Sequence, residues 1–445
     1  MDIKRKIHKF NNMISACVYI CYSEVLIKLH KPLRGDYRKF KLVASCFIAK
    51  FKKFKEYNDK MNVLRLKNQQ IIRCGFVVYS SSMWNFDKLY YLFKNHEAFS
   101  VNIIVAHVSD TNIDKESAES EYSKTVLYFK NKHLEVFDAK RISALDYDLL
   151  FYLTPFALVE EQFHYYNIPL SVGLLHSSYS YMLAGNMSKL KKWLYHFALA
   201  YYTDTNYYKQ LIEKTDLYTR NAKYLGFPKM DQFYTAEFQR RSTKKIIIYA
   251  PHHSVNYTEY KSATFEDNYL DILELAKQHA DSTYWIYKPH PLLRPHSVVA
   301  GIFDSVEEYD RYVDEWNNLE NADVVTSGEY FSLFKESDAM ITDSVSFLAE
   351  YQFTHNPLLL LESGKEKYND FGNSILDILY KCPGDDISGI ESFIMDIVSE
   401  KDDMKEKRMA FFEDNLSYRK NSMSANYRIF KDILEFTGKE EKNEE

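Results

Sequence analysis

Two polar clusters in the C-terminal half of the chain directly follow short apolar runs. Lys288 and His290 come after residues 283–287 (TYWIY), and Asp343 comes after residues 338–341 (DAMI). β-Branched and aromatic runs of this length are typical of buried strands. Ligands of parallel α/β sheets bind at the carboxyl ends of strands, where loops and helix N-termini meet. The sequence therefore predicts a site for a nucleotide diphosphate in this half of the protein.

His290 is the residue of the first cluster best suited to meet a phosphate. It lies between Pro289 and Pro291, and each proline ring fixes its own φ, so the backbone around the imidazole is stiff. An imidazole there can donate a hydrogen bond to a phosphate oxygen as the leaving diphosphate gains charge, and Lys288 adds a cation. The alternative is a loop histidine beside a turn, but the presence of Asp343 in the same half of the chain favours a functional role for His290.

The second cluster is predicted at the start of a helix over residues 345–353. Asp and Ser are frequent N-caps, and the N–H groups of a helix start also bind phosphate, so capping and binding are compatible roles. Glu350 follows Asp343 by about two helical turns, which places both residues on one face. For Glu350 the alternative is a solvated helix glutamate. The polar members of this cluster are Asp343, Ser344 and Ser346.

Histidines also follow two other predicted strands. His176 comes after residues 170–175, and a histidine suits a general base because its pKa is near neutral; a structural histidine is the alternative. His252, His253 and Ser254 follow the first strand of the C-terminal half, and we expect them to line the phosphate or acceptor side of a cleft. Adjacent side chains point in different directions, so we expect at most one of the two histidines to be functional.

The motif residues resemble the CDP-glycerol glycerophosphotransferase family, teichoic-acid and capsule polymerases with the GT-B fold. That family has a His-Pro after one strand of its C-terminal domain and a Thr-Asp-Tyr-Ser-Ser segment at a later helix start. An acidic residue follows one to two turns into that helix. The equivalents here are His290-Pro291, residues 342–346 (TDSVS) and Glu350, and the resemblance extends over roughly residues 170–362.

The resemblance implies a role for each motif. His176 matches the histidine of a His-Gly segment that is regarded as the general base on the acceptor hydroxyl, although Ser177 stands here in place of the glycine. The family's Ala-Pro-Thr also differs, because His252 and His253 follow the Ala-Pro of this chain. The implied donor is CDP-glycerol or CDP-ribitol, and the implied acceptor is a lipid-linked or polymeric cell-surface glycan. The donor would be bound by Lys288, His290, Asp343, Ser344, Ser346 and, through the ribose hydroxyls, Glu350.

We expect no metal and no cofactor, since the nucleotide-activated donor is itself a substrate. Asp146 and Asp148 mimic an Asp-x-Asp metal motif but precede a predicted strand instead of following one. The chain has neither a Gly-x-Gly-x-x-Gly nor a Walker loop. The scattered cysteines lack zinc-site spacing and fit a reduced, cytoplasmic compartment; they are Cys17, Cys21, Cys46, Cys74 and Cys382.

Charge is distributed unevenly along the 445 residues. Residues 1–67 contain 17 Lys/Arg and 5 Asp/Glu, a net charge of +12, so residues 68–445 carry −17 of the total of −5. Apolar residues lie among these charges at helical spacing. The region predicts either peripheral docking on the anionic inner face of the cell membrane or a helical extension with a solvated basic face. No nucleic-acid motif accompanies it and the body is acidic, so nucleic acid is not an expected partner. Residues 14–29 are too few and too charged to span a bilayer comfortably, and they lack a signal-peptide cleavage site.

Strand and helix runs alternate in two blocks, which predicts two Rossmann-like α/β domains facing a cleft. We predict a basic helical extension over 1–67, an acceptor domain over 68–240, a donor domain over 241–385, and C-terminal helices with an acidic tail over 386–445. The predicted strands are 71–79, 101–108, 148–153, 170–175, 199–202, 222–225, 245–250, 283–287, 323–326, 338–341 and 358–361. The predicted helices are 86–99, 113–131, 187–197, 265–279, 306–318, 331–336, 345–353, 387–399 and 402–436.

Two other functions stay open on the sequence. One is a GT-B glycosyltransferase that uses a CMP-, UDP- or GDP-linked sugar in capsule or lipopolysaccharide synthesis, which the departures at Ser177 and at His252 and His253 favour. The other is a non-catalytic GT-B-like scaffold of an envelope assembly complex. The retained His176 and His290 count against the scaffold.

Overall fold

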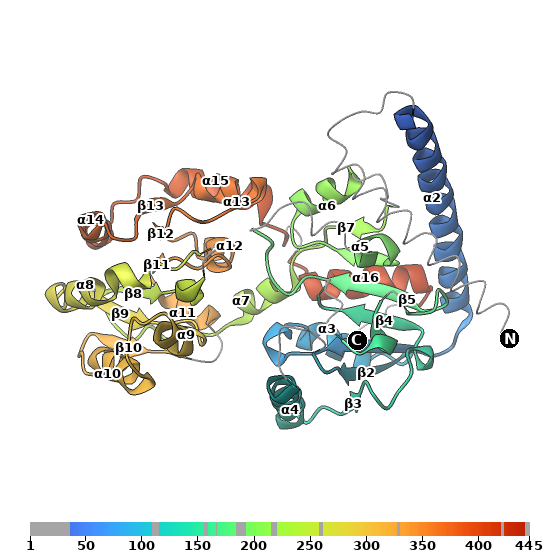
Figure 1. Ribbon diagram of the computed structural model, residues 1–445, viewed down its shortest axis with the longest axis horizontal. Coiled ribbons are helices and arrows are strands. Elements are labelled where there is room, and N and C mark those ends of the chain that lie inside the picture. The colour runs from blue at the N-terminus through green and yellow to red at the C-terminus, as the bar shows by residue number, and fades with distance from the viewer. Residues whose placement is uncertain are drawn as a thin grey trace. The chain divides into compact units, whose positions relative to one another are not determined.

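The chain forms two compact units (Figure 1). A computed structural model describes residues 36–108, 115–154, 159–165, 167–183, 193–214, 220–257, 261–326, 330–419 and 422–440. The described residues of unit 1 fall within 1–179, 190–225 and 426–445, and those of unit 2 fall within 180–189 and 226–425.

Unit 1 contains a seven-stranded sheet in which all neighbouring strands are parallel. The strand order is β3-β2-β1-β4-β5-β6-β7, so the direction of winding changes between β1 and β4. Its strands are β1 (Ile72–Val78), β2 (Phe99–Val105), β3 (Val136–Asp138), β4 (Leu149–Tyr152), β5 (Gly173–Ser177), β6 (Ala200–Tyr202) and β7 (Ala222–Lys223). Its helices are α2 (Asp36–Asn68), α3 (Asp87–Lys94), α4 (Lys115–Asn131), α5 (Trp193–Phe197), α6 (Asn206–Glu213) and α16 (Ala425–Thr437), the last of which begins at the junction with unit 2.

Unit 2 repeats this topology with six parallel strands in the order β10-β9-β8-β11-β12-β13. The winding changes between β8 and β11, and this pair of strands is the switch point where ligands of such sheets bind. Its strands are β8 (Lys245–Ala250), β9 (Thr283–Tyr287), β10 (Ala322–Val324), β11 (Ala339–Thr342), β12 (Leu358–Glu362) and β13 (Tyr380–Pro383). Its helices are α7 (Asp231–Thr235), α8 (Phe265–Gln278), α9 (Leu293–Val299), α10 (Val306–Asn317), α11 (Phe331–Glu336), α12 (Phe347–Glu350), α13 (Asp370–Leu376), α14 (Ile387–Val398) and α15 (Lys405–Asn415).

The prediction of two parallel α/β sheets is confirmed, with differences in single elements. The strands predicted at 245–250 and 283–287 have the same bounds as β8 and β9. β3 and β13 were not predicted, because each is a short edge strand without a continuous apolar run. The helix predicted at 345–353 is α12 followed by a 3₁₀ turn, and the one predicted at 402–436 is two helices, α15 and α16.

The part of the basic extension that the structure describes is one long helix, α2, which is attached to unit 1 (blue in Figure 1). The buried Lys55 ammonium donates to the Ala198 carbonyl at 3.0 Å, and Asn62 donates to the Leu170 carbonyl at 2.9 Å. The Arg65 guanidinium lies 2.7 Å from the Asp148 carboxylate. α2 is therefore part of the fold of unit 1. Residues 1–35 of the predicted extension lie outside the described residues. No helix within the described part of the chain is long and apolar enough to cross a membrane.

The C-terminal helix α16 completes the core of unit 1, although α15, the helix before it, belongs to unit 2. Its buried residues Ile429, Phe430, Ile433 and Leu434 pack in the same apolar cluster as β1 and β2. The return of a C-terminal helix to the first unit is typical of the architecture that the resemblance implies.

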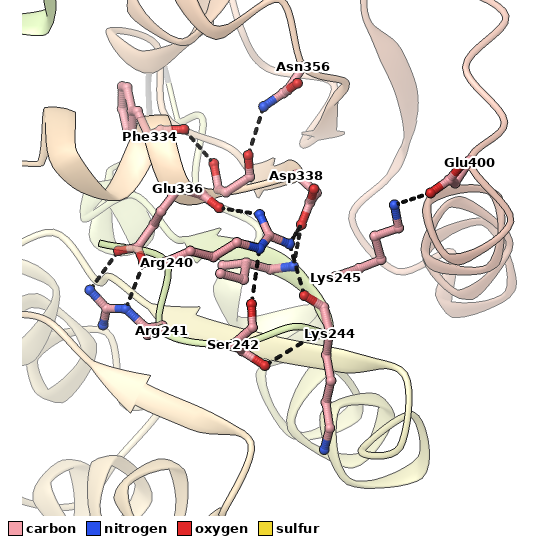
Figure 2. Close-up of polar contacts among 12 residues, drawn as sticks. Arg240, Arg241, Ser242, Lys244, Lys245, Phe334, Glu336, Asp338, Asn356 and Glu400 are labelled. Atoms are coloured by element: carbon pink, nitrogen blue, oxygen red, sulfur yellow. Dashed lines mark hydrogen bonds and ion pairs between the residues drawn. The ribbon is translucent and has the colours of Figure 1, made fainter. Parts of the chain in front are cut away.

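The polar segment 239–244, predicted as the junction between the domains, is bound to unit 2 by arginines (Figure 2). Arg241 forms a two-pronged ion pair with the buried Glu336, with distances of 3.0 and 2.6 Å, and Arg240 donates to the Glu336 carbonyl at 2.9 Å. Unit 2 begins earlier, at Gly226, where φ is +100° and a Cβ would lie 2.4 Å from the Tyr418 ring. Only glycine fits this backbone conformation and this close approach.

Candidate functional site

The predicted site residues of unit 2 lie on loops that follow β8, β9 and β11, at the switch point of the sheet, except Glu350, which is the last residue of α12. Hydrogen bonds hold these loops together: the His290 N–H donates to the Pro251 carbonyl at 3.1 Å, and the Thr342 hydroxyl donates to the Ala250 carbonyl at 2.6 Å. Because the three strands are parallel neighbours, their carboxyl ends meet at one edge. The structure thus brings His290 together with His252 and His253.

Asp343 lies beneath these loops and holds them in position. One carboxylate oxygen accepts the His252 N–H at 2.5 Å, and the other accepts the Thr264 N–H at 2.7 Å and its hydroxyl at 3.2 Å. Burial raises the pKa of Asp343 to about 7, against the lowering effect of these donors. All of its described partners are donors, which suits the ionised carboxylate. A direct contact between Asp343 and the donor nucleotide stays a prediction.

The His290 imidazole is oriented by its own loop. Its Nδ1 accepts the Leu292 N–H at 3.1 Å, so in the neutral ring the proton is on Nε2, which can then donate to an anion. Burial, with smaller contributions from His296 and Lys288, lowers the pKa of His290 to about 4. His290 is therefore a neutral hydrogen-bond donor in the free protein at neutral pH.

Lys288 and Glu350 are connected through Tyr330. The Lys288 ammonium lies 5.7 Å from the centre of the Tyr330 ring, and burial lowers the pKa of Lys288. Tyr330 donates its hydroxyl hydrogen to one oxygen of Glu350, and Lys229 lies 2.7 Å from the other. Glu350 is fully buried, so the alternative of a solvated helix glutamate is excluded. Contact between Glu350 and ribose hydroxyls stays a prediction. In such a contact, a ribose hydroxyl would donate to a Glu350 oxygen that already has a protein partner.

The serines of the two motifs differ in their surroundings. The buried Ser254 hydroxyl accepts the N–H groups of Ser262 and Ala263, each at 3.0 Å, so it holds a turn. Ser344 is buried, and its N–H donates to the Thr342 hydroxyl at 3.0 Å. Ser346 precedes α12 and makes no side-chain capping bond. The predicted N-cap is therefore not formed by Ser346.

His176 is in unit 1 and is the penultimate residue of β5, so it lies within the strand and not after it as predicted. Its Nδ1 lies 2.7 Å from the Tyr152 carbonyl, which only accepts, so the proton is on Nδ1 and Nε2 carries a lone pair. Nε2 is buried and has no hydrogen-bond partner among the residues described. Burial lowers the pKa of His176 to about 4. This tautomer is the one that a general base requires, and Nε2 must become accessible before it can act.

Three residues of the unit 2 site were not predicted from the sequence: Lys229, Tyr330 and His296. None follows a predicted strand directly: Lys229 and Tyr330 each come four residues after one, just before α7 and α11, and His296 lies within α9. The rule that selects strand ends therefore passes over them, and only tertiary contacts identify them.

One group of side chains in the described part of the chain has spacing compatible with a metal ion. Ligand atoms of His107, Asp138 and Glu160 in unit 1 lie within 4.8 Å of one another. His107 Nδ1 lies 2.8 Å from a Glu160 oxygen, and the same oxygen accepts the His107 N–H at 2.9 Å. Hydrogen bonding accounts for the proximity of His107 and Glu160, and we assign no metal to the group. Asp146 accepts the Ser143 N–H in the capping box of a 3₁₀ turn, and Asp148 pairs with arginines.

Comparison with known proteins gives a family match and several similar folds. The chain matches the model of the CDP-glycerol:poly(glycerophosphate) glycerophosphotransferase family over residues 177–435. The match includes Lys288, His290, Asp343 and Glu350, whereas His176 lies one residue before its start. No curated protein matches the sequence significantly.

Three solved structures are similar in fold. A variant of the wall teichoic acid polymerase TagF is 13% identical with a TM-score of 0.51, over 91% of this chain and 97% of that one. A putative UDP-N-acetylglucosamine 2-epimerase from Listeria monocytogenes is 13% identical with a TM-score of 0.51, over 84% and 99%. The S. aureus protein MnaA, solved with UDP, is 12% identical with a TM-score of 0.50, over 83% and 97%.

At these identities the solved structures show the fold alone, and they confirm the GT-B architecture of two parallel α/β units. The family match shows more, because it covers over half of the chain and contains the predicted donor motifs in order. The chain therefore belongs to the CDP-glycerol:poly(glycerophosphate) glycerophosphotransferase family.

Proposed function

We propose that the protein transfers glycerol phosphate, or a similar polyol phosphate, from a CDP-activated donor to a lipid-linked or polymeric cell-surface glycan. The observation that carries this proposal is the family match over residues 177–435, which contains the loops that meet at the switch point of unit 2. The donor nucleotide binds at those loops, with His290 and Lys288 on the diphosphate.

The chemistry requires charge stabilisation on the leaving nucleotide. The acceptor oxygen forms a bond to the phosphorus that carries the polyol, and the bond from that phosphorus to the bridging oxygen breaks. CMP leaves with the bridging oxygen and the additional negative charge. The Nε2–H of His290, fixed by the bond from Leu292, donates to this charge as it develops, and the Lys288 ammonium acts beside it.

His176 is the proposed base on the acceptor hydroxyl. Its Nδ1–H is held by the Tyr152 carbonyl, which leaves Nε2 to remove the proton as the acceptor attacks. Replacement of this ring should abolish transfer without a large change in nucleotide affinity.

Nucleotide binding and transfer test the proposal together. We expect CDP to raise the melting temperature, because a ligand that binds only the folded state stabilises it by about 2.7 kcal/mol at a hundred times its Kd. We expect His290→Ala to weaken CDP binding and to reduce transfer of labelled glycerol phosphate severely. His279→Ala is the matched control, since His279 is a partly buried histidine of the same unit that faces Glu391.

The two other functions give different results in the same experiment. Stabilisation by CMP, UDP or GDP but not by CDP would favour a nucleotide-sugar glycosyltransferase. A folded protein that binds no nucleotide would favour the non-catalytic scaffold. Either outcome refutes the proposal.

An anionic membrane surface is the proposed partner of α2. Phe54, Tyr57, Met61 and Leu64 are spaced three or four residues apart on this helix and are 37–64% exposed, and the same helix carries the exposed Lys53, Lys60 and Lys67. An exposed apolar stripe with flanking cations is typical of helices that lie in a membrane interface. We therefore propose peripheral docking on the inner face of the cell membrane.

Point variants test this docking better than truncation, because α2 also holds unit 1 together through Lys55 and Arg65. Leu64→Glu should reduce flotation with anionic vesicles, and raised salt should reduce flotation of the unmodified protein. Leu270→Glu in α8 is the control, since Leu64 and Leu270 are 53% and 56% exposed. Equal flotation of both variants would leave α2 as a structural helix only.

A further inference from the structure

Four histidine rings gather on one side of the switch point of unit 2. His252 and His253 follow β8, His290 follows β9, and His296 lies in α9. The centre of the His253 ring is 4.2 Å from that of His252, 4.1 Å from that of His290 and 5.2 Å from that of His296. His253 is therefore the central ring of this histidine cluster.

Two rings of the cluster are fixed as neutral hydrogen-bond donors. Backbone N–H groups donate to His290 Nδ1, from Leu292 at 3.1 Å, and to His252 Nδ1, from Ser254 at 3.3 Å. A nitrogen that accepts a hydrogen bond carries no proton, so both neutral rings carry it on Nε2. Protonation of Nδ1 would direct two N–H groups at each other. His290 and His252 can donate to an anion but are poorly placed to take up a proton.

His253 differs from these two rings. Its Nδ1 is buried without a hydrogen-bond partner among the described residues, and its Nε2 lies 3.4 Å from the Tyr257 hydroxyl. No backbone N–H of the described chain blocks protonation of either nitrogen. His296 Nδ1 lies 2.9 Å from the His253 carbonyl, which only accepts, so Nδ1 carries the proton of the neutral ring and His296 Nε2 is the second candidate proton acceptor of the cluster.

The charged groups around His253 keep it neutral in the free protein. Burial, with smaller contributions from His290 and His296, lowers the pKa of His253 to about 4. Lys288 lies on the His290 side of the cluster, and the Asp343 carboxylate is occupied by the His252 N–H and by Thr264. In α9, Arg294 pairs with Asp310. Within the described part of unit 2, no carboxylate forms an ion pair with the His253 ring.

We propose that His253 takes up one proton when the diphosphate of the donor binds, so that the histidine cluster becomes cationic only with the nucleotide in place. This inference rests on the proposed function, because it takes the diphosphate to lie at His290. A diphosphate that reaches the His290 Nε2–H lies beside the ring that stacks on it at 4.1 Å. An opposite charge at about 4–6 Å favours the protonated ring.

Proton uptake makes the affinity depend on pH. Between the pKa of His253 in the free protein and its higher pKa in the complex, each unit of rising pH lowers the affinity about tenfold. Below the free pKa the ring is protonated in both states, and the dependence disappears.

Calorimetric titration with CDP-glycerol, without an acceptor, measures the proton directly. The binding heat at pH 5.5, above the pKa of His253 in the free protein, is compared in buffers that differ in ionisation enthalpy, and the slope gives the protons taken up per nucleotide. Both phosphates of CDP-glycerol are diesters, so the ligand lacks the second ionisation near pH 6 of a phosphate monoester. An opposite charge raises a pKa by about 1–3 units, so we expect between about half and one proton for the unmodified protein, and affinity that falls by up to about tenfold from pH 5 to pH 6.

Variants assign the proton to one ring. His253→Asn should bind with almost no proton uptake and little pH dependence, whereas His296→Asn, which retains a donor for the His253 carbonyl, should keep the uptake. The control His279→Asn should match the unmodified protein. Binding without proton uptake, uptake that persists in His253→Asn, or uptake lost in His296→Asn would each overturn the inference while leaving the proposed function intact. A folded protein that does not bind CDP-glycerol would overturn both.

Discussion

Replacing Lys229 by methionine should destabilise unit 2 strongly, because it removes the cation from a buried ion pair. The Lys229 ammonium lies 2.7 Å from the Glu350 carboxylate, whose other oxygen accepts the Tyr330 hydroxyl. Glu350 is fully buried, whereas the Lys229 side chain is 19% exposed. Methionine retains most of the aliphatic packing of lysine and leaves the carboxylate without its counter-charge.

Breaking a buried pair by removing one partner costs about 3–5 kcal/mol. The partial exposure of Lys229 and the remaining bond from Tyr330 place the expected cost of Lys229→Met at the lower end, about 3 kcal/mol. In a unit of this size each kcal/mol lowers the melting temperature by about 2–4 °C, so we expect a loss of about 6–12 °C. Glu350→Gln in the same background removes the uncompensated charge, and the double variant should therefore recover part of this loss.

Thermal melts of the four proteins of this double-mutant cycle measure the coupling. Lys277→Met is the control, because Lys277 faces only exposed glutamates at 3.7 and 3.8 Å and such pairs contribute about 0–1 kcal/mol. A change for Lys229→Met no larger than that of the control, or strictly additive effects of the two substitutions, would show that the pair does not stabilise unit 2. CDP affinity of Glu350→Gln, measured on the same samples, tests the predicted ribose contact.

Three further predictions concern the attachment of α2, the junction segment and the base. Hydrogen bonds from Arg73, Gln69 and Arg65 hold the pKa of Asp148 at about 2. The stability that the ionised Asp148 contributes is therefore present above its unfolded pKa near 4 and is lost as the pH falls towards 2. The melting-temperature difference between the unmodified protein and Asp148→Asn should shrink over that range, and a constant difference would contradict this. Arg241→Ala should lower the free energy of unfolding in chemical denaturation by about 2–3 kcal/mol, because it leaves the buried Glu336 without its cation. Arg241→Lys should lose only part of this stability, since lysine keeps the charge but lacks the planar guanidinium. Full stability of Arg241→Lys would contradict a two-pronged pair. His176→Ala should abolish transfer and leave CDP affinity nearly unchanged in calorimetry, and activity within a few-fold of the unmodified protein would remove His176 from the mechanism.

The fold was predictable because its strands are short apolar runs with helical segments between them. Residues 245–250 and 283–287 are buried central strands, and in such strands local pattern and tertiary environment agree. The strands β3 and β13 were missed because edge strands bury less and need no continuous apolar run. The break between α15 and α16 follows from the assignment of these helices to different units, which no local pattern indicates.

The candidate site was predictable to the level of which loops form it. Polar residues after β8, β9 and β11 necessarily meet at one edge, since the strands are parallel neighbours. Which atoms face a ligand was not predictable. Asp343 and Ser254 use their oxygens to hold the loops, and Glu350 is paired with Lys229 through contacts distant in the sequence.

The sequence by itself determined the two α/β units, the family motifs and the strand ends at which chemistry is possible, because apolar periodicity and motif order are local properties of the chain. Only the tertiary structure decided the charge state and orientation of the side chains there. The proton on His290 is placed by a backbone N–H, and His253 is kept neutral by burial among other rings. These properties depend on desolvation and on neighbours from separate strands and helices, and such neighbours exist only in the folded protein.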